Sequence, residues 1–430
     1  MQSDAARKIA RALESDLALL SEAETQSHQR SVGDTNDGAR ESESDPERSE
    51  LPAFPRLAWR GIFAQYRDEM RKCSEASDVY NFLTIWVAAG NALGRRISFR
   101  YGMPLFTNVY GIAFGASGDF KTSACRRGSE ITERAGLRVV RGIGSGEGIA
   151  AGLGEEPTLY FLEEFTSLLR PGKWEGSTLL PTLTEIFDCP ERYEREYRKN
   201  PIVLNRPVCS ILAATTEAWF WRDVRENDFE GGFGNRFVYL TGPRNPPVSL
   251  PGVPNLQFAI DALHELKDVR EQEARLDAKA QRIWEAFYLY WRKEHFAPLE
   301  GAATKRIPAY VLKLAMTYSC LERTLPEIQA EQLIAAMQVG RYAARCAQHL
   351  IGARFSGANA LRELEKRILA VVARSPRLTT SKRDLYRALA RHYQNSEQFN
   401  RVFESMVRAG SLYVQLSNHR RAYVSSEPFD

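Results

Sequence analysis

Short runs of apolar residues alternate with helix-like stretches between residues 97 and 250. Runs rich in β-branched and aromatic side chains predict strands, and strands alternating with helices predict a parallel sheet covered on both faces. We therefore expect an α/β fold for this part of the chain. The five runs are Thr107–Phe114, Leu137–Arg141, Thr158–Leu162, Val208–Ala214 and Arg236–Leu240.

Helical spacing dominates on both sides of these runs. Two helices are expected near residues 57–73 and 77–93, and the stretch Ser123–Arg134, interrupted only by Gly128, predicts another within the α/β region. A proline-rich segment that begins at Pro243 ends this region. The periodicity of residues 256–355 then predicts a helical domain.

The C-terminal segment predicts three helices followed by a hairpin. Ser381–Asp384 is a capping box that opens the second helix, and Gly410 is placed to end the third. This order of elements is that of a winged helix-turn-helix. Its parts are the helix Leu361–Arg374, the helix starts Ser381–Asp384 and Asn395–Gln398, and the strands Tyr413–Leu416 and Arg421–Ser425.

The N-terminal segment is polar and acidic. Residues 24–50 have almost no apolar side chains, so they cannot bury a core and are expected to be disordered. Residues 1–50 hold 6 basic and 12 acidic side chains, whereas residues 361–430 hold 13 basic and 7 acidic ones. A basic C-terminal end favours a polyanionic partner there, although a solvated basic face explains it equally well.

Composition places the chain among ordinary globular proteins. Its 430 residues are 43% hydrophobic and 26% charged, and no apolar run approaches the length of a membrane helix. The six cysteines are scattered without a CxxC pair, which is typical of the reducing cytoplasm and of chains without disulfides or zinc. We expect a cytoplasmic protein without a membrane partner.

The most informative motif is the stretch Gly115–Thr122, Gly-Ala-Ser-Gly-Asp-Phe-Lys-Thr. A predicted strand precedes it and a predicted helix follows it, which is the order that a phosphate-binding loop requires. Its glycines let backbone N–H groups close around a triphosphate, Lys121 would reach the β- and γ-phosphates, and Thr122 would bind Mg²⁺. Phe120 stands where such loops usually have glycine. The expected nucleotide-binding residues are Gly115, Ser117, Gly118, Asp119, Phe120, Lys121 and Thr122.

Two carboxylates follow the third of the five apolar runs. Glu163 and Glu164 follow Thr158–Leu162 directly. In a nucleotide hydrolase with a phosphate loop, the first such carboxylate holds Mg²⁺ through water and the second polarises the attacking water. By itself, an apolar strand that ends in Glu-Glu is common, so its position after the loop is what favours this interpretation.

Two later positions complete the expected site. Thr215 ends a predicted strand and would position the water, unless it only caps the next helix. Arg236 follows a glycine run and is suited to presentation to a neighbour's phosphate, although a surface arginine on a loop is an equally good interpretation. Arg306, at the start of a helix in the helical region, would contact the nucleotide from there.

This ordered set resembles the AAA+ module of minichromosome-maintenance helicases, and the P-loop proteins that accompany primase–helicase genes in prophages and plasmids. The resemblance covers residues 100–430. That family's Asp-Glu-Phe, Ala-Ala-Asn and Ser-Arg-Phe motifs correspond to Glu163-Glu164-Phe165, Ala213-Ala214-Thr215 and Asn235-Arg236-Phe237. In that family the residue before the lysine is commonly not glycine. The insertion hairpin and N-terminal collar of those helicases have little or no counterpart here.

The resemblance implies a domain organisation and an assembly. It comprises a tail (residues 1–55), a P-loop ATPase core of the AAA+ type (56–250), an α-helical lid (251–358) and a C-terminal winged helix-turn-helix (359–430). It also implies ATP and Mg²⁺ as ligands and a homo-oligomer, a hexameric ring, in which Arg236 serves the next subunit's site.

DNA contacts are expected in two places. A segment before the Val208–Ala214 run corresponds to a channel hairpin of the helicases, although alternating charge also fits a solvated segment. Phosphate contacts from the winged helix would make binding salt-dependent, and only its recognition helix would read bases. Winged helices also serve as protein-docking modules. The candidates are Arg195, Arg198 and Lys199 in the first place, and Lys382, Arg383, Arg387, Gln398, Arg401, Arg408, Arg420 and Arg421 in the second.

The function expected from these features is an ATP-dependent DNA motor or replication-initiation ATPase of a mobile element, with replication or mobile-element proteins as further partners. One alternative is a nucleotide-gated or nucleotide-free DNA-binding adaptor, in which Phe120 and Glu163 mark a degraded site. A small-molecule kinase is a weaker alternative, because the winged helix and the paired carboxylates argue against it.

Overall fold

A computed structural model gives the structure of the chain. Its contacts divide the chain into two compact units, one ending at His349 and the other beginning at Leu350. The structure describes residues 51–154, 156–172, 177–195, 202–224, 228, 232–293, 298–375, 379–390, 396–408, 411–416 and 422–426. Residues 24–50, for which disorder is expected, lie outside these ranges.

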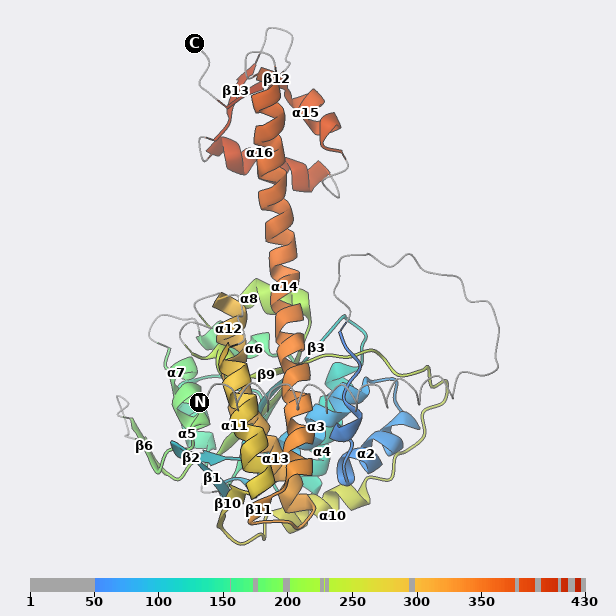
Figure 1. Ribbon diagram of the computed structural model, residues 1–430, viewed down its shortest axis with the longest axis vertical. Coiled ribbons are helices and arrows are strands. Elements are labelled where there is room, and N and C mark those ends of the chain that lie inside the picture. Colours follow the sequence, from blue (N-terminus) through green and yellow to red (C-terminus); the bar gives the residue numbers. More distant parts are fainter. Residues whose placement is uncertain are drawn as a thin grey trace, which may run out of the picture. The chain divides into compact units, whose positions relative to one another are not determined.

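A five-stranded parallel sheet forms the centre of the N-terminal unit (Figure 1). Its strand order is β4-β5-β8-β3-β9, so each of the five predicted runs contributes one strand. The predicted α/β class and the parallel sheet are therefore confirmed. The strands are β3 (Tyr110–Phe114), β4 (Arg138–Arg141), β5 (Thr158–Leu162), β8 (Cys209–Thr215) and β9 (Val238–Leu240).

Helices cover both faces of this sheet. A side chain at Gly111 of β3 would collide with Leu83 and Val87 of α3, whereas the neighbouring Tyr110 donates a hydrogen bond to the carbonyl of Leu183 in α7. Because adjacent residues of a strand point to opposite faces, α3 and α7 lie on opposite sides of the sheet. The helices of this region are η1 (Arg56–Ala58), α2 (Ile62–Arg71), α3 (Asp78–Leu93), α4 (Lys121–Arg134), α5 (Gly146–Gly152), α6 (Thr166–Gly172), α7 (Leu179–Phe187), α8 (Glu217–Asp223) and η2 (Gly234–Arg236).

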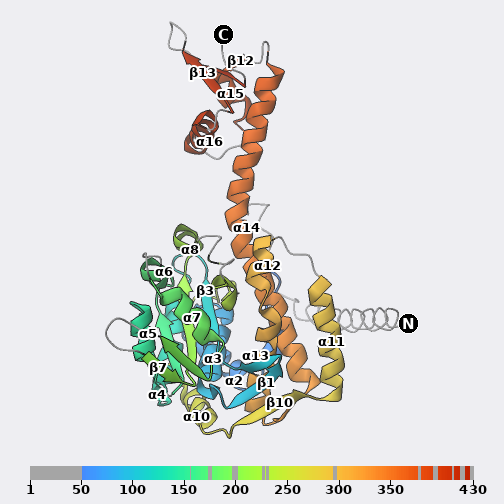
Figure 2. The ribbon, with the colours of Figure 1, turned by 90° about the vertical axis from the view of Figure 1, so that its left-hand side faces the viewer.

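A second sheet, which the apolar pattern does not predict, lies in the same unit. Strand β1 pairs antiparallel with β2 and parallel with β10, which in turn pairs with β11. Figure 2 shows β1 and β10 side by side. The expectation of helix throughout residues 256–355 is therefore wrong at β10 and β11. In β10 only Ala274 is buried, so its backbone pairing leaves no apolar alternation in the sequence. The strands are β1 (Ile97–Tyr101), β2 (Met103–Phe106), β10 (Gln272–Leu276) and β11 (Glu327–Ile328).

Helices fill most of the remaining described residues between 256 and 374. The last of them, α14, is continuous from Ala330 to Arg374, so the helix expected at Leu361–Arg374 is its final part. The expected boundary at residue 358 falls inside this helix. The helices are α10 (Gln257–Leu266), α11 (Ala278–Lys293), α12 (Pro298–Thr304), α13 (Ile307–Leu321) and α14. Strands β6 (Arg192–Arg195) and β7 (Ile202–Asn205) pair antiparallel in a separate two-stranded sheet.

The C-terminal unit combines the end of α14 with two short helices and a three-stranded antiparallel sheet in the order β12-β14-β13. Ser381 caps α15 by accepting a hydrogen bond from the N–H of Asp384 at 3.0 Å, as the capping box predicts. The expected pairing of the last two strands is also present, while Gly410 and the turn between those strands lie outside the described residues. The elements are β12 (Thr379–Ser381), α15 (Lys382–Ala388), α16 (Ser396–Arg408), β13 (Tyr413–Leu416) and β14 (Ala422–Ser425).

A small apolar core holds the C-terminal unit together. It joins the three helices to the sheet and leaves the basic residues of α15 at the surface or half-buried. The buried residues are Leu364, Ile368, Val372, Leu385, Leu389, Phe399, Val402, Phe403, Met406, Leu412 and Val424. Among the described helices of the chain, none has the length and apolar character needed to cross a membrane.

Candidate functional site

The glycine-rich loop, residues 115–122, joins the carboxyl end of β3 to the first residue of α4. Gly115 is packed so closely that a side chain there would meet Tyr80 Oη at 2.4 Å and Asp119 Oδ2 at 2.9 Å. The same Tyr80 hydroxyl donates a 2.9 Å hydrogen bond to the carbonyl of Phe114. The start of the loop therefore requires glycine and is anchored to α3.

Phe120 adopts a left-handed backbone conformation immediately before α4, with φ 55° and ψ 18°. Glycine is the residue that reaches this region without strain, which explains why glycine is usual here. The ring of Phe120 is 41% exposed, and the guanidinium of Arg244 lies 5.1 Å from its centroid. Phenylalanine thus maintains the loop conformation at an energetic cost and adds an aromatic surface.

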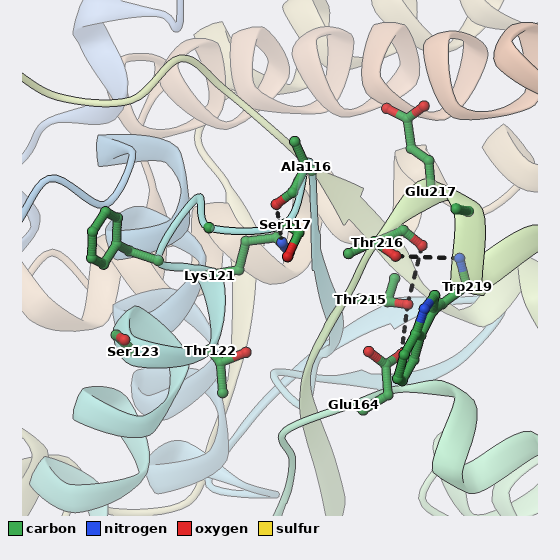
Figure 3. A pocket seen from close by; sticks show the side chains of 14 residues that line it. Ala116, Ser117, Lys121, Thr122, Ser123, Glu164, Thr215, Thr216, Glu217 and Trp219 are labelled. Carbon is green, nitrogen blue, oxygen red and sulfur yellow. Dashed lines mark hydrogen bonds between the residues drawn. The ribbon is translucent and has the colours of Figure 1, made fainter.

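Lys121 points back along the loop. Its Nζ donates a hydrogen bond to the carbonyl of Ala116 at 2.5 Å (Figure 3). The residue is only 6% exposed. Burial lowers the pKa of this amine, while the charges of Asp119 and Glu164 partly oppose that effect. A cation at the N-terminus of the 14-residue helix α4 favours an anion at this position.

The two glutamates that follow β5 have different surroundings. Glu164 Oε1 accepts hydrogen bonds from the Thr215 hydroxyl at 2.7 Å and from the N–H of Thr166 at 3.2 Å. The Glu163 carboxylate instead pairs with Arg126 of α4 at 2.7 Å and is more than half exposed. The loop nevertheless touches Glu163, because Thr122 Oγ1 lies 3.4 Å from its carbonyl oxygen.

The tip of β8 brings Thr215 to the same edge of the sheet, since Thr215 is in register with Phe114 of β3. Thr216 caps α8 by accepting from the N–H of Trp219 at 3.2 Å. The capping interpretation therefore applies to Thr216, and Thr215 is directed to Glu164. Trp219, which is 46% exposed, forms part of the wall beyond Thr215 (Figure 3).

These residues surround one cavity of about 940 Å³. Lys121 and Thr122 lie on one side of it, and Glu164, Thr215 and Trp219 lie on the other (Figure 3). The structure brings together most of the residues expected there, but Asp119 and Glu163 are not part of the lining. The lining residues are Gly115, Ala116, Ser117, Gly118, Phe120, Lys121, Thr122, Ser123, Glu164, Thr215, Thr216, Glu217, Ala218 and Trp219.

Arg236 and Arg306 lie at the amino ends of the parallel strands, opposite the carboxyl ends that the glycine-rich loop follows. Arg236 precedes β9, and its carbonyl accepts a hydrogen bond from Tyr310, whose hydroxyl also donates to Tyr110 at the start of β3. One carboxylate, that of Asp188, binds both arginines, through Arg236 Nη2 at 3.1 Å and Arg306 Nη1 at 3.0 Å. Burial and the nearby Arg306 lower the pKa of Arg236. Neither arginine is placed to act on the cavity of its own chain.

The structure describes some of the candidate residues for DNA contact, and the others lie outside the described residues. Arg195 ends β6, but its guanidinium donates to Thr182 at 3.1 Å and Glu185 at 3.3 Å. In the C-terminal unit Arg383 and Arg387 are exposed on α15, and Arg401 and Arg408 are exposed on α16. Lys382 is half-buried, with its amine 4.5 Å from the centroid of the Phe403 ring. Gln398 lies in α16, while Arg198, Lys199, Arg420 and Arg421 lie outside the described residues.

Sequence reasoning did not identify four residues that shape these sites. They are Asp188 between the two arginines, Arg126 on Glu163, Arg244 on Phe120, and Trp219 in the cavity wall. Only Trp219 carried a usable signal, since it lies four residues after the expected Thr215. The other three act through contacts between distant segments.

Comparison with known proteins provides no family assignment, since the chain matches neither a protein-family model nor a curated protein. Within the described residues, no group of three or more His, Cys, Asp and Glu side chains is arranged to hold a metal ion.

Proposed function

We propose that the chain is an ATPase that binds DNA, a helicase-like motor or replication-initiation ATPase of a mobile element with an AAA+-type P-loop core, an α-helical lid and a C-terminal winged helix. The observation that carries this proposal is the convergence of the glycine-rich loop, Glu164 and Thr215 on one cavity at the carboxyl edge of the parallel sheet. In open parallel sheets, ligands bind at this edge.

In this proposal, residues of the cavity and the neighbouring Glu163 have separate roles in hydrolysis. The loop N–H groups and the α4 N-terminus would hold the phosphates, and Lys121 would exchange the Ala116 carbonyl for a phosphate oxygen. Glu164, oriented by the Thr215 hydroxyl, would accept the proton of the attacking water. Thr122 and Glu163 would hold Mg²⁺, for which Glu163 must leave Arg126. When bound, that ion would neutralise charge on the phosphates.

The two arginines at the other edge support a shared site. Arg236 and Arg306 would reach the phosphate of a neighbouring copy, as in the ring that the resemblance implies. Asp188 holds both cations side by side. A guanidinium supplied in this way accelerates phosphoryl transfer by about 10³–10⁵-fold where it has been measured.

ATP hydrolysis with and without DNA tests this proposal. We expect DNA-stimulated turnover in wild type and a loss of about 100-fold or more in Glu164→Gln, within the range reported for general bases. Glu130→Gln is the matched control, because Glu130 is a half-exposed glutamate of α4 that pairs only with Arg127 in the described structure. Unchanged turnover in Glu164→Gln would refute the assigned role.

Mixing two inactive variants tests the shared site. Lys121→Ala retains Arg236 for its neighbour, and Arg236→Ala retains its own loop, so a mixture should recover activity that neither variant has alone. Absence of recovery would show that Arg236 is structural. For DNA binding, Arg383→Ala and Arg387→Ala should each weaken binding and lower the slope of log affinity against log salt by about 1.

One observation favours the alternative of a nucleotide-gated DNA-binding adaptor. The Glu163 carboxylate is paired with Arg126 and lies outside the cavity lining, which suits binding without turnover. ATP binding by the wild type without hydrolysis, together with ATP-dependent DNA affinity, would favour the adaptor over the motor.

A further inference from the structure

A second cavity, of about 670 Å³, lies next to the glycine-rich loop. The segment that enters the folded part of the chain forms one wall, α2 and the start of α3 form another, and the segment after β9 closes it. Its lining residues are Leu51, Pro52, Ala53, Phe54, Arg56, Trp59, Ala64, Arg67, Arg71, Ser77, Asp78, Val79, Pro243, Arg244 and Asn245.

One pair of side chains in contact links the linings of the two cavities. Phe120 lines the cavity at the glycine-rich loop, Arg244 lines the second cavity, and the Arg244 guanidinium lies 5.1 Å from the centroid of the Phe120 ring. Arg244 also forms an ion pair with Glu75. A ligand bound to the loop would therefore need only to pass this pair to enter the second cavity.

The walls of the second cavity suit a flat heteroaromatic group. Trp59 is half-buried, and the guanidinium of Arg67 lies 4.9 Å from its ring centroid. Planar guanidinium groups and indole rings both stack on nucleobases. Asp78 and Asn245 are fixed by a 2.9 Å hydrogen bond between them, so the polar groups at the rim are already ordered.

We propose that the second cavity holds the base and ribose of the nucleotide whose phosphates bind the glycine-rich loop, with Arg244 and Trp59 as base-binding residues. This inference rests on the proposed nucleotide binding and adds a recognition site to it. Phe120 then has a role that glycine could not fill, because its ring orients Arg244 at the passage between the two cavities.

Equilibrium binding of Mg–ATP and of Mg–tripolyphosphate to the full chain tests the proposal, because tripolyphosphate has no base. We expect wild type to bind ATP at least tenfold more tightly than tripolyphosphate. Arg244→Ala should weaken ATP binding about tenfold, as expected for loss of one stacking contact, and leave tripolyphosphate within about twofold. Arg134→Ala, an exposed arginine on the same unit, should change neither affinity.

Tryptophan fluorescence gives a second readout, in which ATP and tripolyphosphate are compared on the same folded protein. ATP should quench emission in wild type and in Trp284→Phe, because Trp284 lines neither cavity, but not in Trp59→Phe. Tripolyphosphate should leave the Trp59 signal unchanged. Equal affinity of wild type for the two ligands, or equal weakening of both by Arg244→Ala, would overturn the base site while leaving phosphate binding intact. Failure to bind either ligand would instead overturn the proposed nucleotide binding and the base site with it.

Discussion

Replacing Phe120 with glycine should yield a more stable protein than replacing it with alanine, the reverse of the usual order next to a helix. Phe120 has φ 55°, and an L side chain in this region costs about 1–2 kcal/mol. Glycine removes that cost but adds about 0.5–1 kcal/mol of entropy to the unfolded chain. Both variants lose the contact with Arg244, so their difference isolates the backbone. The free energy of unfolding of Phe120→Gly should therefore exceed that of Phe120→Ala by about 0.5–1 kcal/mol.

Urea unfolding followed by circular dichroism measures this difference. The control is the pair Ser123→Gly and Ser123→Ala, because Ser123 is exposed and lies in α4 three residues further along the chain. There the alanine variant should be more stable, by up to about 1 kcal/mol. The reasoning is refuted if alanine is at least as stable as glycine at Phe120, since the residue would then not be held in a left-handed conformation.

Three further predictions concern single contacts. Gly115→Ala should cost about 1–3 kcal/mol of unfolding free energy, because its Cβ would meet Tyr80 Oη, and less in a Tyr80→Phe background. Burial lowers the pKa of Lys313 to about 8, so the unfolded chain binds more protons than the folded one between about pH 8 and 10, and wild type should gain stability relative to Lys313→Met as pH rises through this window. Ser381→Ala removes the cap of α15 and should lower the stability of this helix by about 1 kcal/mol, measured by amide hydrogen exchange.

Each of these has an outcome that would contradict it. Equal costs of Gly115→Ala with and without the Tyr80 hydroxyl would show that the loop accommodates a side chain. Parallel pH profiles of wild type and Lys313→Met would mean that the buried amine keeps its usual pKa. Unchanged exchange of the α15 amides in Ser381→Ala would mean that the cap contributes no stability.

The central sheet could be predicted because buried parallel strands appear as continuous apolar runs. Thr158–Leu162 is buried at each position, and the predicted bounds equal those of β5. Strands at exposed places lack this signal, as β10 shows, because backbone pairing rather than side-chain burial defines them. The continuity of α14 was also missed, since Ser-Gly-Ala-Asn at residues 356–359 has weak helix propensity, which the structure overrides.

The candidate site could be predicted where its residues follow strands directly. Glu164 and Thr215 end neighbouring parallel strands, so strand order alone brings them together. Asp188 and Arg244 could not be found in this way, because each acts on a residue more than 40 positions away in the sequence. The separate environments of Glu163 and Glu164 likewise depend on Arg126, a helix residue that no motif includes.

The glycine-rich loop and the Arg236–Arg306 pair occupy opposite edges of one sheet, which has a consequence for how the protein would be controlled. In the proposed assembly an isolated chain carries halves of two different catalytic centres and completes neither. Its abundance would then act as a threshold: dilution should silence hydrolysis at saturating ATP, and turnover per chain should rise with protein concentration until assembly is complete.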